Sequence, residues 1–459
     1  MPADRLLLRD GTVIDTEPEP HARHAVDVLI EDGRIAAVGP GLPSAGATVL
    51  DCSGHIVLPG FVDAHRHLWQ TVLRGIAPDA GLMDYVSLVQ RRLARRLTPE
   101  DVHAATLAGA LECLDGGITT VQDYSDIQRS PGHTEAALSA LREAGVRAVF
   151  GYGYPLFGPG GGRPAVRDPA EVRRVRAEHF PGDGSLLRMV LAPRGPSYSP
   201  MDTVREDWLL ARELGLRIAV HVASGPLADH PVAALRDHDL LAPGTLYVHG
   251  NSLPGHELLL IAGSGGSVSI APAVEAQMGH GPPMITRLRE AKVTTALGAD
   301  VVTSSPGDMF SLMRAALLTA RLEHPVDRTW RPSGEPGREG EAAPRLTTSD
   351  VLRMATLDGA VALGLDDQVG SLRVGKQADL LLIRTGVVNL SGARHDPVGT
   401  VVTAAHPGNV DTVLVAGEPV KYAGRLVTPA APAAVTATHR SAGRLAETLR
   451  ASAPGPGRS

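Results

Sequence analysis

The spacing of apolar and polar positions near the two ends of the chain differs from the spacing in the middle. Near the start, Leu6–Ile14 and Val26–Gly39 are each typical of two short strands joined by an Asp-Gly turn. Similar short apolar runs return at 379–383 and 410–420. Because a few short strands rarely make a stable core alone, we predict that residues 1–57 and 370–428 form one small β-sandwich domain.

Between these ends, strand-like apolar runs alternate with runs of helical period, such as Pro99–Leu114, His133–Ala144 and Pro200–Leu214. The predicted strands are Leu58–His65, Ile118–Tyr124, Val146–Tyr152, Leu187–Pro193, Arg217–Val222, Leu246–His249, Ser267–Ala271 and Val293–Asp300. This alternation predicts an α/β fold, a (β/α)8 TIM barrel over residues 58–369. A doubly wound open sheet would also explain the alternation, but not the polar residues at the strand ends.

Composition and charge narrow the class of protein. Of the 459 residues, 43% are hydrophobic, and the formal net charge is -6. A negative chain argues against nucleic-acid and anionic-membrane partners, and no apolar run is long enough to span a membrane. The start of the chain lacks the apolar core of a signal peptide, so we predict a cytoplasmic protein. The tail, 429–459, is predicted to hold a helix over Val435–Ala451 and a disordered end.

Five polar residues follow the predicted barrel strands and suggest a metal site. His65 and His67 are two positions apart in an extended segment, so both imidazoles can reach one ion. His221, His249 and Asp300 each close another apolar run. In a barrel the carboxyl ends of the strands meet at one mouth, where active sites are built. The sequence therefore predicts that these five side chains converge.

These residues and their surroundings resemble the amidohydrolase superfamily, and more narrowly the branch with cytosine deaminases, guanine deaminases and triazine chlorohydrolases. The matching segments cover nearly the whole chain and are Pro59–His67, His221, Val248–Gly250, Leu297–Asp300 and Val369–Leu380. The resemblance implies that His65, His67, His221 and Asp300 bind one divalent ion. Zinc is the first choice, with iron or manganese as alternatives. It also implies a homo-oligomer, a dimer or larger, that acts on a small molecule.

The same resemblance assigns His249 to the neighbourhood of the water that the ion activates. Asp300 can then accept the proton of that water, and a protonated His249 can stabilise the oxyanion. In the deaminase branch a glutamate usually follows the fifth-strand histidine by three residues, but here Ser224 stands at that position. Three alternatives follow: Asp300 carries all the protons, Glu275 substitutes as a further catalytic carboxylate, or the leaving group needs no strong acid.

Four residues near the predicted mouth are candidates for substrate binding: Gln70, Trp69, Ser224 and Gln277. An amide can donate and accept at a lactam or amidine edge, and an indole can stack on a planar ring. Arg194 and His280 are weaker candidates.

The predicted function is metal-dependent hydrolysis of a non-peptide C–N bond in a small cyclic amide, amidine or amino-heterocycle. The alternatives are a non-hydrolytic metalloenzyme of the same fold, because of Ser224, and an inactive binding protein on the same scaffold.

Overall fold

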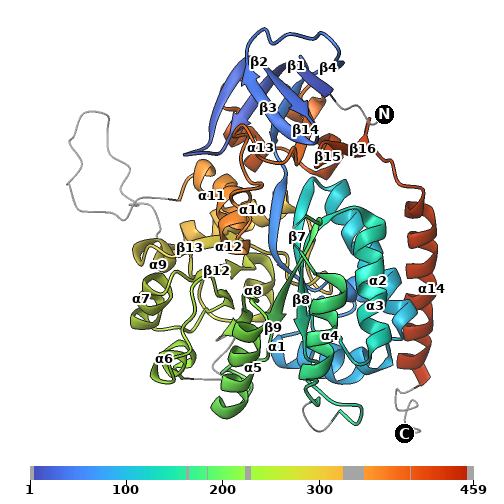
Figure 1. Ribbon diagram of the computed structural model, residues 1–459, viewed down its shortest axis with the longest axis vertical. Coiled ribbons are helices and arrows are strands. Elements are labelled where there is room, and N and C mark those ends of the chain that lie inside the picture. Colours follow the sequence, from blue (N-terminus) through green and yellow to red (C-terminus); the bar gives the residue numbers. More distant parts are fainter. Residues whose placement is uncertain are drawn as a thin grey trace, which may run out of the picture.

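The computed structural model describes residues 5–161, 165–182, 184–222, 229–323, 346–392 and 394–451, so Ser224 lies outside the described residues. Parallel strands surrounded by helices form the larger part of the molecule, and a separate sheet built from both ends of the chain lies at one end of it (Figure 1). The predicted fold class, a TIM barrel with a β-structure made from both termini, is confirmed. None of the helices within these ranges is long and apolar enough to cross a membrane.

The barrel strands form two parallel sheets of four strands each. The first contains β6 (Phe61–Arg66), β7 (Ile118–Ser125), β8 (Arg147–Gly153) and β9 (Leu187–Ala192), and the second contains β10 (Ala219–Val222), β11 (Leu246–His249), β12 (Ser267–Ile270) and β13 (Thr294–Leu297). Single parallel bridges, Leu191 with Ile218 and Arg66 with Asp300, connect the two sheets at both seams. Every predicted barrel strand therefore overlaps an observed one, and the strand ends converge as expected.

The prediction of one strand over Leu58–His65 is wrong in one respect. The apolar run is broken at Gly60 into β5 (His55–Pro59), which pairs in the terminal sheet, and β6, which opens the barrel. A Cβ atom at Gly60 would lie 2.0 Å from Thr119 Oγ1, so only glycine permits this close approach of the two segments. The chain thus passes from one part of the molecule to the other within a single residue.

Helices surround the barrel strands, and the three predicted ones agree closely with α2, α3 and α5. They are α2 (Pro99–Asp115), α3 (Pro131–Ala144), α4 (Pro169–His179), α5 (Met201–Glu213), α6 (Pro231–Asp237), α7 (Gly255–Gly263), α8 (Pro272–Met278), α9 (Ile285–Glu290), α10 (Met309–Glu323), α11 (Thr348–Met354) and α12 (Leu357–Leu363). Between β6 and α2 lie four short helical segments: η1 (Leu68–Leu73), α1 (Leu82–Tyr85), the π-helix η2 (Val86–Leu93) and η3 (Ala94–Arg96). Thr98 and Asp101 form a capping box that starts α2.

The terminal sheet joins the two ends of the chain. Its strands are β1 (Arg5–Asp15), β2 (His21–Glu31), β3 (Arg34–Gly39), β4 (Thr48–Asp51), β5, β14 (Leu380–Arg384), β15 (Val410–Val415), β16 (Glu418–Tyr422) and β17 (Arg425–Leu426). The antiparallel pairing of β5 with β14 connects the two halves, and Leu8, Val28, Leu380 and Leu414 share one hydrophobic cluster. The exact domain boundaries stay a prediction.

The predicted hairpin over Leu6–Ile14 is wrong, because β1 is a single strand with an irregularity at Asp10 and Gly11. The backbone N–H of Asp10 donates to Asp27 Oδ1 at 2.9 Å, which stabilises a bulge where a turn was expected. The second hairpin is present, with β2 and β3 joined at Asp32 and Gly33.

Three further short helices lie in the last part of the chain: η4 (Val388–Leu390), α13 (Pro397–Thr403) and η5 (Pro407–Asn409). The final helix, α14 (Ala430–Ala451), begins five residues before the predicted Val435 and lies beside α2 on the outside of the barrel (Figure 1). The Thr438 hydroxyl donates to the Ala104 carbonyl at 3.2 Å, and Leu445 is buried.

Candidate active site

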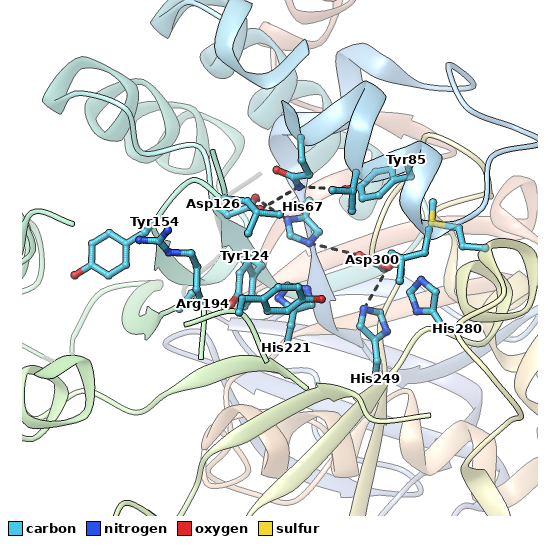
Figure 2. A pocket seen from close by; sticks show the side chains of 17 residues that line it. His67, Tyr85, Tyr124, Asp126, Tyr154, Arg194, His221, His249, His280 and Asp300 are labelled. Atoms are coloured by element: carbon cyan, nitrogen blue, oxygen red, sulfur yellow. Dashed lines mark hydrogen bonds and ion pairs between the residues drawn. The ribbon is translucent and has the colours of Figure 1, made fainter. Parts of the chain in front are cut away.

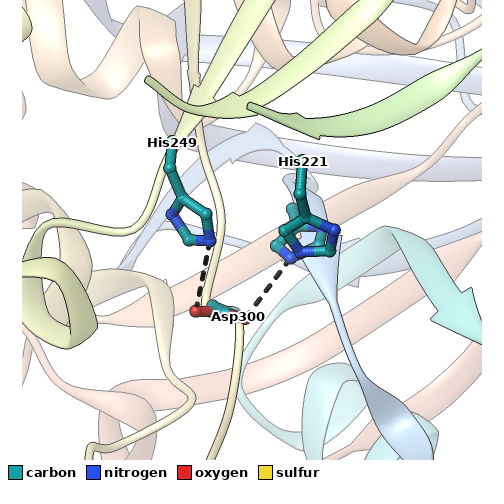
Figure 3. Close-up of side chains that lie close together, drawn as sticks. His221, His249 and Asp300 are labelled. Carbon is teal, nitrogen blue, oxygen red and sulfur yellow. Dashed lines mark ion pairs between the residues drawn. The ribbon is translucent and has the colours of Figure 1, made fainter. Parts of the chain in front are cut away.

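The five polar residues predicted at the strand ends do converge. His65 lies on β6, His221 on β10 and His249 at the end of β11, and ligand atoms of these three and of Asp300 all lie within 4.8 Å of one another (Figure 3). His67 also reaches Asp300 (Figure 2). The convergence is built by the backbone, since Asp300 N–H donates to the His65 carbonyl and His67 N–H to the Asp300 carbonyl, both at 2.8 Å.

Local backbone conformation places Asp300 and His249. Both residues have positive φ angles, 56° for Asp300 and 66° for His249, which non-glycine residues adopt at an energetic cost. A Cβ atom at Gly298 would lie 2.8 Å from the His65 carbonyl oxygen, so glycine lets the end of β13 approach β6. The positive φ angles turn the Asp300 and His249 side chains towards the mouth of the barrel, and the close approach at Gly298 brings Asp300 next to His65.

The carboxylate of Asp300 divides the histidines between its two oxygens. His65 Nε2 lies 3.3 Å and His67 Nε2 3.5 Å from Oδ1, whereas His249 Nε2 lies 3.7 Å from Oδ2. Two ligands about 2.0–2.1 Å from a tetrahedral zinc ion are roughly 3.3 Å apart. The separations around Oδ1 match this value more closely than the separation at Oδ2. His67 and His249 thus each reach one oxygen of Asp300, and His249, not His67, belongs to the group whose ligand atoms all lie within 4.8 Å of one another. The assignment of His67 as a ligand and His249 as a neighbour stays a prediction.

A divalent ion fits these residues. His65 is completely buried. Its Nδ1 has no hydrogen-bond partner among the described residues, and its Nε2 lies 3.3 Å from Asp300 Oδ1 without an aligned hydrogen bond. A buried imidazole without a partner is costly unless something outside the protein satisfies it. Imidazoles and a carboxylate are the ligand types of catalytic zinc sites, and iron and manganese accept them too.

The electrostatics of the site keep Asp300 charged. Burial alone would raise the pKa of Asp300, but the contact with His65 and the charges of the other imidazoles outweigh it and hold this pKa far below its usual range. Burial likewise disfavours charge on His249, yet Glu275 and Asp300 raise its pKa above the usual value. In this arrangement Asp300 is held in its anionic form, and His249 holds a proton more readily than a free imidazole does.

The Amidohydrolase family model matches residues 56–420 of this chain. The chain belongs to the amidohydrolase family. A 5-methylthioadenosine/S-adenosylhomocysteine deaminase of Symbiobacterium thermophilum is 28% identical over 428 residues, which cover 90% of this chain and 93% of that protein. A 5'-deoxyadenosine deaminase of Methanothermobacter thermautotrophicus is 30% identical over 403 residues, with coverages of 85% and 88%.

Solved structures agree with this assignment. A zinc-containing adenosine deaminase from Xanthomonas campestris superimposes with a TM-score of 0.83 at 25% identity, covering 97% of this chain and 99% of that one. Atrazine chlorohydrolase from Arthrobacter aurescens, complexed with zinc, gives the same TM-score at 24% identity, with coverages of 95% and 100%, and supports the fold alone. The chain is thus a metal-dependent hydrolase of the deaminase type, which confirms the predicted class acting on non-peptide C–N bonds.

Each of two histidines of this amidohydrolase is paired with a carboxylate through its second nitrogen. His67 Nδ1 lies 2.9 Å from Asp126 Oδ1, and His249 Nδ1 lies 3.0 Å from Glu275 Oε1. Glu275 also accepts from Ala271 N–H at 2.8 Å. The His249 ring thus separates Glu275 from Asp300. This position favours Glu275 as a residue that orients His249, and a direct role in proton transfer stays an untested prediction.

Three of the predicted substrate-binding residues are not among those that line the cavity at the site. The Trp69 indole donates to Asp126 at 2.6 Å, and the Gln70 amide to the Tyr85 hydroxyl at 2.6 Å, and both side chains are buried. Gln277 is exposed and donates to the Pro78 carbonyl. Their assignment to substrate binding therefore gains no support from the cavity.

The cavity brings in residues that sequence reasoning missed. Its described lining comprises His67, Leu82, Tyr85, Val86, Gln90, Tyr124, Asp126, Tyr154, Leu156, Ala192, Arg194, Tyr198, His221, His249, Met278, His280 and Asp300 (Figure 2). Arg194 and His280 had been only weak candidates. Asp126 follows β7 directly, so the same strand-end rule that identified His249 could have found it.

Proposed function

We propose that this amidohydrolase removes the amino group of a small planar amino-heterocycle by hydrolysis, with one zinc ion held by His65, His67, His221 and Asp300. The observation that carries the proposal is the convergence of His65, His221, His249 and Asp300 at the ends of the barrel strands, with His67 also within reach of Asp300. The choice of His67 over His249 as the fourth ligand follows the family resemblance. The deaminases of adenine nucleosides among its relatives make adenine nucleosides the first substrates to test. Cyclic amides and amidines are the next classes.

A bound divalent ion lowers the pKa of water from 15.7 towards roughly 7 and polarises the bond under attack. Asp300 faces the cavity, so its carboxylate can accept the proton of the attacking water and pass it to the departing amine. His249 can donate a hydrogen bond to the oxygen that gains negative charge, while Glu275 holds its ring in place.

Asp300 is also the best carrier for the protons that the missing glutamate would otherwise move. Ser224 lacks a carboxylate, and Asp126 and Asp300 are the carboxylates that line the cavity within the described ranges. Asp126 accepts hydrogen bonds from Trp69 and Gln90 and is paired with His67, which leaves it little freedom. Of the three alternatives that the sequence left open, proton transfer by Asp300 alone therefore has the most support.

Arg194 favours a substrate with a hydrogen-bond acceptor at the end remote from the ion. Its guanidinium lines the cavity and donates to the Ala165 carbonyl at 2.8 Å, without a carboxylate in ion-pair contact among the described residues. Burial lowers the pKa of Arg194. A carbonyl, hydroxyl or acidic group of the substrate would satisfy its remaining donors.

The test is ammonia release by the zinc-loaded protein from adenosine, 5-methylthioadenosine, 5'-deoxyadenosine, S-adenosylhomocysteine, cytosine and guanine. Release from at least one is expected, and Asp300→Asn should slow it by about 10²–10⁴-fold if Asp300 is the proton carrier. Zinc content is measured for both proteins, because Asp300 is also a proposed ligand. Silence of the zinc-loaded protein across this panel would favour the non-hydrolytic alternative, which Ser224 motivates. A failure to bind zinc would favour the inactive binding protein.

A further inference from the structure

His280 lies at the edge of the catalytic cavity but has no place in the mechanism described above. It is the second residue after the end of α8, and its backbone N–H donates to the Glu275 carbonyl at 3.0 Å. The two neighbouring glycines, Gly279 and Gly281, have φ angles of 70° and 128°, a conformation that turns the chain sharply at this point. The turn directs the imidazole into the cavity beside His249 and Asp300 (Figure 2).

The side chain of His280 is buried and unsatisfied. It is 3% exposed, and neither of its ring nitrogens has a hydrogen-bond partner among the described residues. Burial, with a smaller contribution from His249, lowers the pKa of His280 to about 4, so the ring is neutral at physiological pH. A neutral imidazole carries one donor and one acceptor. Buried polar groups of this kind are rare unless a water or a ligand satisfies them.

Two simpler roles do not account for this residue. As a packing residue it contacts His249 edge to face, with ring centroids 4.7 Å apart, but a phenyl ring would fill that space without two unsatisfied nitrogens. As a metal ligand it is poorly placed, because it is absent from the group of described residues whose ligand atoms cluster within 4.8 Å and, unlike His67, it makes no ion-pair contact with Asp300. His280 is thus a polar group held beside the reacting centre with its hydrogen-bonding capacity unused.

We propose that His280 hydrogen-bonds the heterocycle next to the carbon under attack, and that it is a specificity-determining residue for this substrate class. The inference rests on the proposed function. One ring nitrogen can accept from an exocyclic amino group or donate to a ring nitrogen, which are the two features of an amidine edge. Asp300 and His249 border the reacting atoms on the same side of the cavity, so His280 is positioned to contact the edge that carries the leaving group.

The experiment compares His280→Phe with His280→Asn and His280→Gln, all loaded with zinc. Phenylalanine keeps the ring and removes both nitrogens, whereas the two amides restore one polar atom near the positions of Nδ1 and Nε2. Affinity is measured for adenosine, cytosine and guanine, by titration calorimetry for those that are not turned over and as KM for those that are. His238→Phe, the same change at an exposed residue that follows α6, is the matched control.

The phenylalanine variant should bind the tightest of these heterocycles about tenfold more weakly, or worse, because a hydrogen bond is lost and a polar group of the ligand is left unpaired. One of the two amide variants should recover most of the affinity, and zinc content and melting temperature should stay unchanged in all of them. Undiminished affinity in the phenylalanine variant would overturn the inference, as would loss of zinc or the absence of recovery in both amides.

Binding and turnover separate this inference from the proposed function. If the heterocycles bind in a His280-dependent way but no ammonia is released, the deaminase proposal fails and the binding role stands. If ammonia is released equally well by the phenylalanine variant, the binding role fails and the deaminase proposal stands. If none of the heterocycles binds to the unaltered protein, the binding role is refuted.

Discussion

Asp126 should control how tightly the site binds zinc, although it is not expected to touch the ion. Its Oδ1 lies 2.9 Å from His67 Nδ1 and 2.6 Å from Trp69 Nε1, and its Oδ2 lies 3.1 Å from Gln90 Nε2. A carboxylate in this position favours the tautomer with the proton on Nδ1, which would leave Nε2, 3.5 Å from Asp300 Oδ1, free to bind an ion. Changing Asp126 should therefore free the His67 ring to rotate and to change tautomer.

The expected loss of zinc affinity follows from the interactions that each substitution at Asp126 removes. Loss of such an outer partner typically weakens metal binding by about 10–100-fold, which corresponds to roughly 1.4–2.8 kcal/mol. Asp126→Ala removes all three interactions and should fall near the upper limit. Asp126→Asn keeps one oxygen as an acceptor for His67 and Trp69, so its loss should be about tenfold. Both substitutions at Asp126 are expected to act on zinc binding through His67.

The assay is competition for zinc between the protein and a chromophoric chelator at one fixed pH. Trp69→Phe is the matched control, because it removes one donor to the same oxygen and leaves the contact with His67 in place. Circular dichroism checks that each variant is folded. Zinc binding by the alanine variant as tight as that of the unaltered protein would refute the reasoning, since either His67 would not be a ligand or Asp126 would not orient it.

Three further predictions concern other buried groups. His67→Ala should abolish both zinc retention and hydrolysis while circular dichroism stays unchanged; a variant that keeps zinc would contradict the ligand assignment. Arg147→Met should lower the free energy of unfolding by about 3–5 kcal/mol in urea, because Asp379, 2.8 Å from Arg147 Nε, is left buried and unpaired; adding Asp379→Leu should recover part of that loss. Glu275→Gln should reduce turnover more than zinc affinity, measured by steady-state kinetics and chelator competition, if Glu275 orients His249 and does not support a ligand.

The sequence was sufficient to predict the residues at the strand ends. His65 and His67 obey the period of two of an extended chain, and Asp300 and His249 follow apolar runs whose ends meet in any barrel. These rules depend only on local periodicity and on the parallel arrangement of strands. Glu275 was found as well, but its side chain points at His249, and that direction depends on the packing of α8 against the strand end.

The same reasoning failed directly after His67, and the reason is local geometry. The chain enters the 3-10 helix η1 at Leu68, where successive side chains rotate by roughly 120° and no longer alternate between two faces. Trp69 and Gln70 therefore turn into the protein interior, although their positions after His67 suggested the cavity. Asp126 obeys the strand-end rule and could have been found by it. The sequence does not show its pairing with His67 and Trp69, because these partners lie far away along the chain.

If Asp300 carries the protons alone, the contacts around it would account for a deaminase-type site without the usual glutamate. One chain of contacts runs from Asp126 through His67 to Oδ1, and another runs from Glu275 through His249 to Oδ2. Under the proposed assignment, the first chain of contacts would support a ligand and the second a proton donor, so the two oxygens of Asp300 would have different roles. A single carboxylate that both binds the ion and moves protons can serve substrates whose leaving group needs little acid assistance. It should serve poorly those that must be protonated on the ring before attack, and the ratio of turnover between these two kinds of substrate is the measurement that decides whether Asp300 acts alone.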